Sequence, residues 1–512
     1  MDKNKVLKQL LDYGILVSPN FFNDLNYDLN YDHFFELVKD RMKTKEILSS
    51  IDLNEIKNNF IETGNMVVQI QEQNVIINSS VKIIKSYNEP IYKKEVKSFV
   101  NYFKNRYVAL RNILSSRQEL QDSISISRLS RKNERESVSI IGMILDKSET
   151  KNGNIKITLE DPTGLFDVLI MKNKSEIYET AKDLVLDEVI GIVGVMGNKI
   201  IFCNNILFPE IPINNELKKS PDEAYAVFIS DIHFGIKNFL QGDFMKFISW
   251  LKGEYGNEGQ REIASKVRYL FITGDVVEGV GIYPGQEEDL DIKDIYLQYE
   301  EAAKYLKMIP NNIKIIMCGG NHDAIRMSEP QPVFDREIAK EIYEIPNIIM
   351  VSNPAVVNIH ASENFPGFNV LMYHGYSFFY FADAVPSIRS KGGISRCDLI
   401  MKYLLQKRHL APSHSATLYV PDENFDPLVI DKVPDIFVSG HVHQITVSSY
   451  RNVSLINSSC WVVQSGDQAK RGMVPNPAKI PIMNLKTREV RIMNFLDDNV
   501  KVLLNERLGL KN

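Results

Sequence analysis

The chain has 512 residues, 44% of them hydrophobic and 24% charged, and its net charge is −5. Two or three domains are expected because this length exceeds one core, and the negative charge argues against a protein that grips nucleic acid by bulk electrostatics. Four scattered cysteines, a polar N-terminus and the lack of a long apolar run argue against a disulfide framework, a signal peptide and a membrane span, so a cytoplasmic protein is expected.

Residues 1–62 predict a small helical N-terminal module, because short apolar stripes recur there at helical spacing. The first stripe is Val6, Leu7, Leu10 and Leu11, and the second begins with Phe34, Phe35, Leu37 and Val38. Such a module can dock a partner, or it can cap the chain without a separate role. The sequence leaves both interpretations open.

Residues 63–136 are expected to hold a tether, a basic amphipathic helix and a linker. The tether, Gly64–Pro90, is only weakly periodic, and the linker, Ser123–Ser137, is polar. Between them, apolar residues fall at helical spacing with Lys and Arg interleaved. Those apolar residues are Val96, Phe99, Phe103, Tyr107, Leu110 and Leu114. A basic aromatic helix suggests nucleic-acid binding, but we favour a packing surface for the stripe and a solvated face for the lysines.

Residues 137–215 have the layout of an OB-fold β-barrel, with three strands, a helix and two further strands. The strand-like runs and the helix are Val138–Leu145, Ile155–Leu159, Leu165–Met171, Ser175–Leu184, Glu188–Met196 and Lys199–Asn204. OB barrels often bind single strands through exposed aromatic residues. Phe166 and Phe202 are the only aromatic residues in these strands, so a barrel that positions other parts or contacts protein is favoured.

Residues 216–512 alternate strand-like runs with helical stretches such as Gly242–Trp250 and Lys293–Leu306, which predicts an α/β sandwich. Five apolar runs end in residues that can bind metal ions. The runs start at Tyr225, Val267, Ile313, Phe368 and Ile436. Ligands in such folds gather outside the carboxyl ends of the strands. The residues expected there are Asp231, His233, Asp275, Asn321, His322, Asp323, His374, His441 and His443.

This set of residues suits the hydrolysis of a phosphate ester by two metal ions. Two divalent ions about 3.5–4 Å apart provide a nucleophile at neutral pH and neutralise charge on the phosphoryl oxygens. Asp275 is the expected bridging ligand. Imidazole and amide ligands favour transition metals over Ca²⁺, so Mn²⁺ is the expected cofactor, with Mg²⁺, Fe and Zn as alternatives. His322 would then be a general acid, and Asp323 would fix its tautomer.

Chance does not explain the placement of the histidines. Five of the nine lie in D-x-H, N-H-D, Y-H-G and H-x-H, each after an apolar run. The other four, His33, His360, His409 and His414, are expected to have ordinary structural roles. His409 in K-R-H-L-A-P is the one that could reach the site.

These motifs resemble the calcineurin-like metallophosphoesterases, and four segments are similar to the small subunits of archaeal family-D DNA polymerases. The segments are G-D-V-V-E-G-V-G-I-Y-P-G-Q-E (Gly274–Glu287), G-N-H-D-A-I-R-M-S-E-P-Q-P (Gly320–Pro332), K-R-H-L-A-P (Lys407–Pro412) and I-N-S-S-C-W (Ile456–Trp461). The resemblance implies a helical N-terminal region, an OB domain and a C-terminal phosphoesterase domain. It also implies a proofreading 3′-to-5′ exonuclease that acts on DNA 3′ ends, single-stranded or in a primer–template. The partner would be the large polymerase subunit, in a heterodimer or heterotetramer.

The resemblance also implies a role for each residue at the strand ends. One metal ion would take Asp231, His233, Asp275 and His443, and the other would take Asp275, Asn321, His374 and His441. His322 would be the catalytic histidine. Related repair nucleases have a further histidine three positions after the bridging aspartate, but this chain has Glu278 there, so that role does not transfer.

Two alternatives to a nuclease are open. Accessory subunits of eukaryotic replicative polymerases share this plan without the catalytic residues, so the chain could be a silent scaffold. The complete ligand set argues against that. A phosphatase or cyclic-nucleotide phosphodiesterase of the same superfamily is the other alternative, and the upstream barrel argues against it.

Overall fold

The computed structural model describes residues 81–88, 93–463 and 474–497. The helical module expected over residues 1–62 lies outside these residues. Within them, no helix combines the length and the apolar character that crossing a membrane requires.

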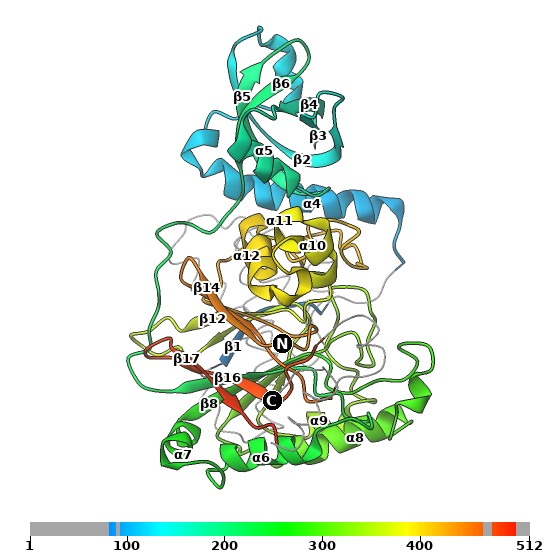
Figure 1. Cartoon of the computed structure of the whole chain (residues 1–512), viewed down its shortest axis with the longest axis vertical. Coiled ribbons are helices and arrows are strands. Elements are labelled where there is room, and N and C mark those ends of the chain that lie inside the picture. Colours follow the sequence, from blue (N-terminus) through cyan, green and yellow to red (C-terminus); the bar gives the residue numbers. More distant parts are fainter. Residues whose placement is uncertain (1–80, 89–92, 464–473, 498–512) are drawn as a thin grey trace, which may run out of the picture. The chain divides into compact units, whose positions relative to one another are not determined.

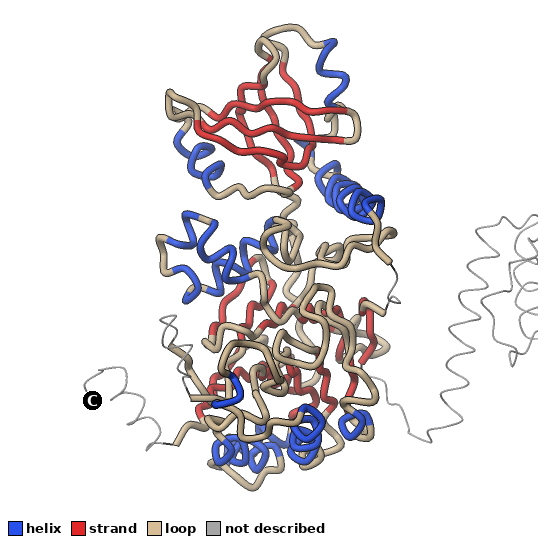
Figure 2. The backbone as a smooth tube through the Cα atoms, turned by 90° about the vertical axis from the view of Figure 1, so that its right-hand side faces the viewer, coloured by secondary structure: helices blue, strands red, loops and turns tan. Residues whose placement is uncertain are grey.

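Five strands form a closed barrel in the order β2-β3-β4-β6-β5 (Figures 1 and 2). They are β2 (Ser137–Glu149), β3 (Ile155–Asp161), β4 (Gly164–Ile170), β5 (Val189–Met196) and β6 (Ile201–Leu207). Helix α5 (Ser175–Lys182) lies between β4 and β5 in the chain. The expected three strands, helix and two strands are therefore present. Alternate residues of β3, such as Ile155, Ile157 and Leu159, point into the barrel core, as the period of a strand requires.

Parts of the segments expected to be tether and linker are structured instead, although the structure describes only residues 81–88 of the expected tether. Residues Val81–Ser86 form β1, which pairs antiparallel with β11 (Ala355–Ile359). The expected linker, Ser123–Ser137, contains the short helix η2 (Ile126–Arg131), and η1 (Gln118–Leu120) lies just before it. Their Leu120, Ile126 and Leu129 side chains are buried, and the last two belong to the barrel core. A few apolar residues therefore hold an otherwise polar segment against the barrel.

The expected basic amphipathic helix is α4 (Val96–Ser115), and one of its faces packs as favoured from the sequence. Tyr107, Leu110 and Leu114 lie in a cluster with barrel residues. The buried Arg106 donates from Nε to Asp426 at 2.7 Å in the C-terminal domain. The helix thus contacts both the barrel and the C-terminal domain, whereas Val96 and Phe99 at its start are exposed.

The C-terminal domain is built on two six-stranded sheets, one of which has β1 from the N-terminal part of the chain as an edge strand. One has the order β10-β9-β8-β7-β16-β17, and the other has the order β1-β11-β12-β13-β15-β14. In the first, β7, β8, β9 and β10 are parallel, and in the second β12, β13 and β15 are parallel. Their bounds are β7 (Tyr225–Ile229), β8 (Val267–Thr273), β9 (Lys314–Cys318), β10 (Ile348–Met350), β12 (Phe368–Met372), β13 (Ile436–Ser439), β14 (Thr446–Tyr450), β15 (Val453–Asn457), β16 (Lys479–Asn484) and β17 (Val490–Asn494).

Helices cover the outer faces of both sheets, which gives the expected α/β sandwich. Helices α6 (Gln241–Leu251), α7 (Glu258–Ser265), α8 (Ile295–Leu306) and α9 (Lys340–Tyr343) pack on the first sheet. On the second sheet lie α10 (Phe378–Ala384), α11 (Pro386–Arg389) and α12 (Cys397–Lys407). Two short helices, η3 (Gln286–Glu288) and η4 (Gly393–Ser395), lie in loops.

The strands of the sandwich are apolar on both faces because both faces are buried. On β7, Val227 and Ile229 pack against the helices, while Ala226 and Phe228 face the other sheet. This explains why the run has no polar alternation and why it breaks so sharply at Ser230-Asp231.

A buried ion pair joins the barrel to the sandwich. The Lys407 ammonium, at the end of α12, lies 2.8 Å from the carboxylate of Glu188, which precedes β5, and both side chains are almost fully buried. Tyr403 also donates to Glu188. Lys407 lies in the K-R-H-L-A-P motif, so part of that motif is explained by this contact.

Candidate metal centre

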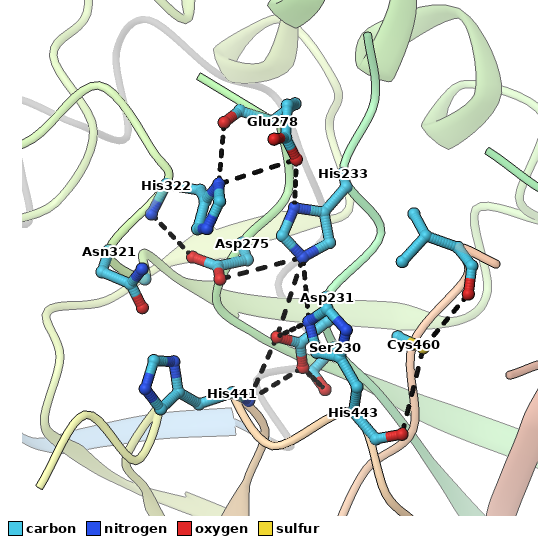
Figure 3. A network of polar contacts seen from close by, with 12 residues as sticks. Ser230, Asp231, His233, Asp275, Glu278, Asn321, His322, His441, His443 and Cys460 are labelled. Carbon is cyan, nitrogen blue, oxygen red and sulfur yellow. Dashed lines mark hydrogen bonds and ion pairs between the residues drawn. The ribbon is translucent and has the colours of Figure 1, made fainter. Parts of the chain in front are cut away.

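The parallel strands of both sheets deliver polar side chains to one common rim. Asp231 and His233 follow β7, Asp275 follows β8, and Asn321 and His322 follow β9. From the other sheet, His374 follows β12, and His441 and His443 follow β13. Figure 3 shows side chains from both sheets pointing toward one another around Asp275.

The backbone at this rim is unusual, because several of these residues have left-handed conformations. The φ angles are 51° at Asp231, 57° at His233, 51° at Asp275, 70° at His441 and 58° at His443. This region is uncommon for residues other than glycine, and each such residue costs about 1–3 kcal/mol. Backbone hydrogen bonds hold the conformation, including Asp231 N to Gly274 O at 3.0 Å and His233 N to Asp275 O at 3.1 Å. Strain of this kind is common at functional sites.

Asp231, His233 and His443 form one group of potential ligands. Their donor atoms all lie within 4.8 Å of one another, and all three residues are buried. His443 Nε2 lies 3.2 Å from Asp231 Oδ1 and 3.1 Å from His233 Nε2. His233 Nε2 also lies 3.9 Å from Asp275 Oδ2, which brings Asp275 to the edge of this group.

Asp275, His374 and His441 form a second group, and their donor atoms also lie within 4.8 Å of one another. His374 Nε2 is 3.2 Å from Asp275 Oδ2 and 3.1 Å from Asn321 Oδ1. On the other side of its ring, His374 Nδ1 lies 2.9 Å from the carbonyl oxygen of Thr273. That contact directs the Nδ1 proton to the carbonyl and leaves Nε2 available to bind a cation.

The charges of the cluster also favour bound cations. Burial would raise the pKa of Asp275, but the charge of His374 prevails and lowers that pKa well below its usual range. Burial would lower the pKa of His374, but Asp275 raises it to about 9. A divalent cation bound at His374 Nε2 would displace the proton there and supply the positive charge beside Asp275 in its place. Carboxylate, imidazole and amide donors are suitable ligands for such ions.

Asp323 does not have the expected role of holding His322. Its carboxylate accepts hydrogen bonds from the backbone amides of Gly320 at 2.8 Å and Val277 at 3.2 Å. The Nδ1 atom of His322 instead lies 2.9 Å from the backbone carbonyl oxygen of Glu278. Asp323 therefore stabilises the loops that carry the neighbouring residues, and adjacency in the sequence did not translate into contact.

Glu278 is a member of the site that the sequence did not identify. Its Oε2 lies 2.8 Å from His233 Nδ1 (Figure 3). Its other oxygen accepts from Tyr283 at 3.1 Å and from Gln286 at 3.0 Å. Burial would raise its pKa, but the hydrogen bond and charge of His233 lower it to about 2. The sequence comparison singled out position 278 only because related repair nucleases have a histidine there, and it predicted no role for the carboxylate of Glu278.

Close packing at the rim explains two of the glycines. A Cβ atom on Gly274, whose φ is 85°, would collide with the ring of His374, and a Cβ on Gly320 would collide with Asp275. Both positions therefore require glycine so that the backbone can approach the ligand cluster.

Three histidines lie away from the cluster, as expected. His409 is buried and lies 2.8 Å from Asp426, the same carboxylate that accepts from Arg106, so it does not reach the site. His360 contacts Asp222, and His414 contacts Asp187. His33 lies outside the described residues.

Comparisons with known proteins agree with this architecture. Residues 225–445 match the calcineurin-like phosphoesterase family, which indicates a metal-dependent phosphoesterase domain. The chain is 41% identical to the DNA polymerase II small subunit of Methanothermobacter thermautotrophicus, over 76% of this chain and 78% of that one. It is 38% identical to that of Archaeoglobus fulgidus, over 79% and 78%. For the Pyrococcus furiosus subunit the identity is also 38%, over 78% and 64%.

Proposed function

This chain belongs to the family of archaeal DNA polymerase II small subunits, and we propose that it is a two-metal 3′-to-5′ exonuclease that removes mispaired 3′-terminal nucleotides. The observation that carries the proposal is the convergence of two ligand groups that can share Asp275. A silent scaffold has no need for this cluster of buried, strained and charged residues.

In this proposal, one ion is held by Asp231, His233, Asp275 and His443, and the other by Asp275, Asn321, His374 and His441. Mn²⁺ is the favoured metal. When bound, the two ions supply a nucleophile and neutralise the charge on the phosphate. Thr273 supports this arrangement, since its carbonyl orients the ring of His374. Glu278 supports it in the same way by contacting His233 on the side away from the ligand group.

His322 is the proposed proton donor. Its side chain lines the cleft above the ligands and is partly exposed. The Nδ1 proton is held by the carbonyl of Glu278, so Nε2 is the atom that, when the ring carries both protons, would give one to the leaving 3′-oxygen of the shortened strand. The backbone amide of His322 also donates to Asp275 Oδ1 at 2.9 Å, which fixes the histidine beside the shared carboxylate.

We assign the barrel to the OB class, because its strand order and the place of α5 match that fold. Phe202 is partly exposed, whereas Phe166 packs against the barrel core, so aromatic residues for stacking bases are few. The proposed role of the barrel is to position the phosphoesterase domain. The names of the relatives support a large polymerase subunit as the partner of this chain. Besides its exonuclease activity, the chain would also support that subunit.

The test is the release of a labelled 3′-terminal nucleotide from primer–templates with a matched or a mismatched end, in Mn²⁺, by the chain alone and with its large subunit. Release of the mononucleotide, faster from the mismatch and absent in Asp275→Ala, is expected. No release under any condition would favour the scaffold. Hydrolysis of phosphomonoesters but not of DNA would favour a phosphatase.

A further inference from the structure

A cleft of about 410 Å³ opens over the ligand cluster. Apart from the polar residues already described, aromatic and apolar side chains line it. They include Ile282, Tyr283, Met327, Tyr376, Phe379 and Tyr380. Ligand pockets usually have such apolar walls with a few polar groups that fix orientation. The walls therefore suit a ligand with an apolar, planar part next to the group that the cluster binds.

Phe379 lines this cleft together with Tyr380 beside it, whereas two other aromatic residues of α10 face the protein core. Phe378 and Phe381 are fully buried in the cluster between the second sheet and the helices that cover it. Phe379 is only partly buried, and its ring lies edge-on to His441 with the ring centres 5.3 Å apart. The core does not use this aromatic side chain, which leaves part of its surface open to the cleft.

Tyr376 lies beside the same histidine. Its ring centre is 5.6 Å from that of His441, with a tilt of 38°. The hydroxyl groups of the other two tyrosines of the cleft make hydrogen bonds: Tyr283 donates to Glu278, and Tyr380 donates to Ser413. In the part of the chain that the structure describes, the Tyr376 hydroxyl has no such partner.

The cleft lacks the usual means of holding a DNA backbone. No Lys or Arg is among the described residues that line it. Proteins normally gain affinity for DNA by neutralising phosphates with these side chains. Stacking of bases on aromatic rings is the other common source of affinity for single strands, and it works with every base.

We propose that Tyr376 and Phe379 form a stacking platform for the base of an unpaired 3′-terminal nucleotide. This inference rests on the proposed exonuclease function and names the substrate that the cleft prefers. A base must leave the duplex to reach a side-chain ring, and this costs least when it is mispaired. The platform would therefore favour mismatched ends without reading their sequence.

The test compares two single-stranded oligonucleotides that differ only at the 3′ end, one with a normal terminal nucleotide and one with an abasic residue. We expect the full chain in Mn²⁺ to prefer the normal end by about 10-fold or more in kcat/KM, as one stacked base would provide. In Phe379→Leu and Tyr376→Ala this ratio should fall toward one, whereas Tyr376→Phe should retain it. Tyr296→Ala, an exposed aromatic residue on α8, is the matched control and should leave the ratio unchanged.

A second readout needs no turnover. The fluorescence of a 3′-terminal 2-aminopurine should be quenched on binding in EDTA by the wild type, and less so by Phe379→Leu. If the wild type degrades both oligonucleotides equally, or if the variants lose activity equally on both, the platform is refuted while the exonuclease stands. If the wild type releases no nucleotide from any substrate, the exonuclease proposal fails and the platform fails with it.

Discussion

The carboxylate of Glu278 lies 2.8 Å from Nδ1 of His233, on the side of the ring opposite to the ligand group. Such contacts orient a metal-binding histidine and raise its basicity. The same residue holds His322 through its backbone carbonyl. One residue thus contacts a proposed ligand and the proposed proton donor.

Glu278→Gln should weaken Mn²⁺ binding, because it removes the negative charge beside His233. Losses of about 10–100-fold in metal affinity or activity are typical for such contacts. Calorimetric titration with Mn²⁺ measures the change. Glu287→Gln makes the same chemical change at an exposed position and should bind Mn²⁺ like the wild type. Equal affinities for the two variants would show that Glu278 does not act on the metal centre.

His322→Ala should retain both metal ions yet lose turnover. The loss expected for a general acid is about 10²–10⁴-fold. Metal content and the rate of nucleotide release are measured on the same sample, with the exposed His414→Ala as the control. If His322→Ala loses metal as well, His322 is a ligand and the assignment of the proton donor is wrong.

Glu188→Ala should destabilise the protein strongly, because it leaves the buried ammonium of Lys407 without its counter-charge. Breaking a buried pair in this way costs about 3–5 kcal/mol. Denaturant unfolding gives the change in the free energy of unfolding. Glu179→Ala removes the exposed pair with Lys182 and should cost at most about 1 kcal/mol. The double variant Glu188→Leu/Lys407→Met should recover stability, and a cost for Glu188→Ala no larger than that for Glu179→Ala would contradict the buried pairing.

The rim was predictable because its residues follow long apolar runs. Strands buried on both faces are hydrophobic throughout, so Asp231 and Asp275 stand out where each run stops. The family resemblance is confirmed by relatives at 38–41% identity. Glu278 was missed because it lies in a loop, where no periodicity marks the direction of a side chain.

Two other features depended on contacts that sequence patterns do not encode. Strand β1 lies in the segment expected to be a tether because that segment is weakly periodic. Its partner β11 lies more than 250 residues away, and a short run with two lysines gives no hint of that pairing. Asp323 was expected to hold His322 because the two are adjacent. The backbone instead turns the carboxylate toward the amides of Gly320 and Val277.

Asp275→Ala should lose both metal ions, because it removes the carboxylate that lies between the two ligand groups. Metal analysis after exhaustive dialysis measures the loss, with the exposed Asp291→Ala as the matched control. Retention of two ions by Asp275→Ala would rule out the shared ligand.

The most direct measurement is a crystal structure of the full chain with Mn²⁺, in which anomalous scattering locates the ions. Two peaks about 3.5–4 Å apart are predicted, with Asp275 between them. Asp231, His233 and His443 should lie at one peak, and Asn321, His374 and His441 at the other. A single peak, or two peaks that do not share Asp275, would contradict the two-metal centre.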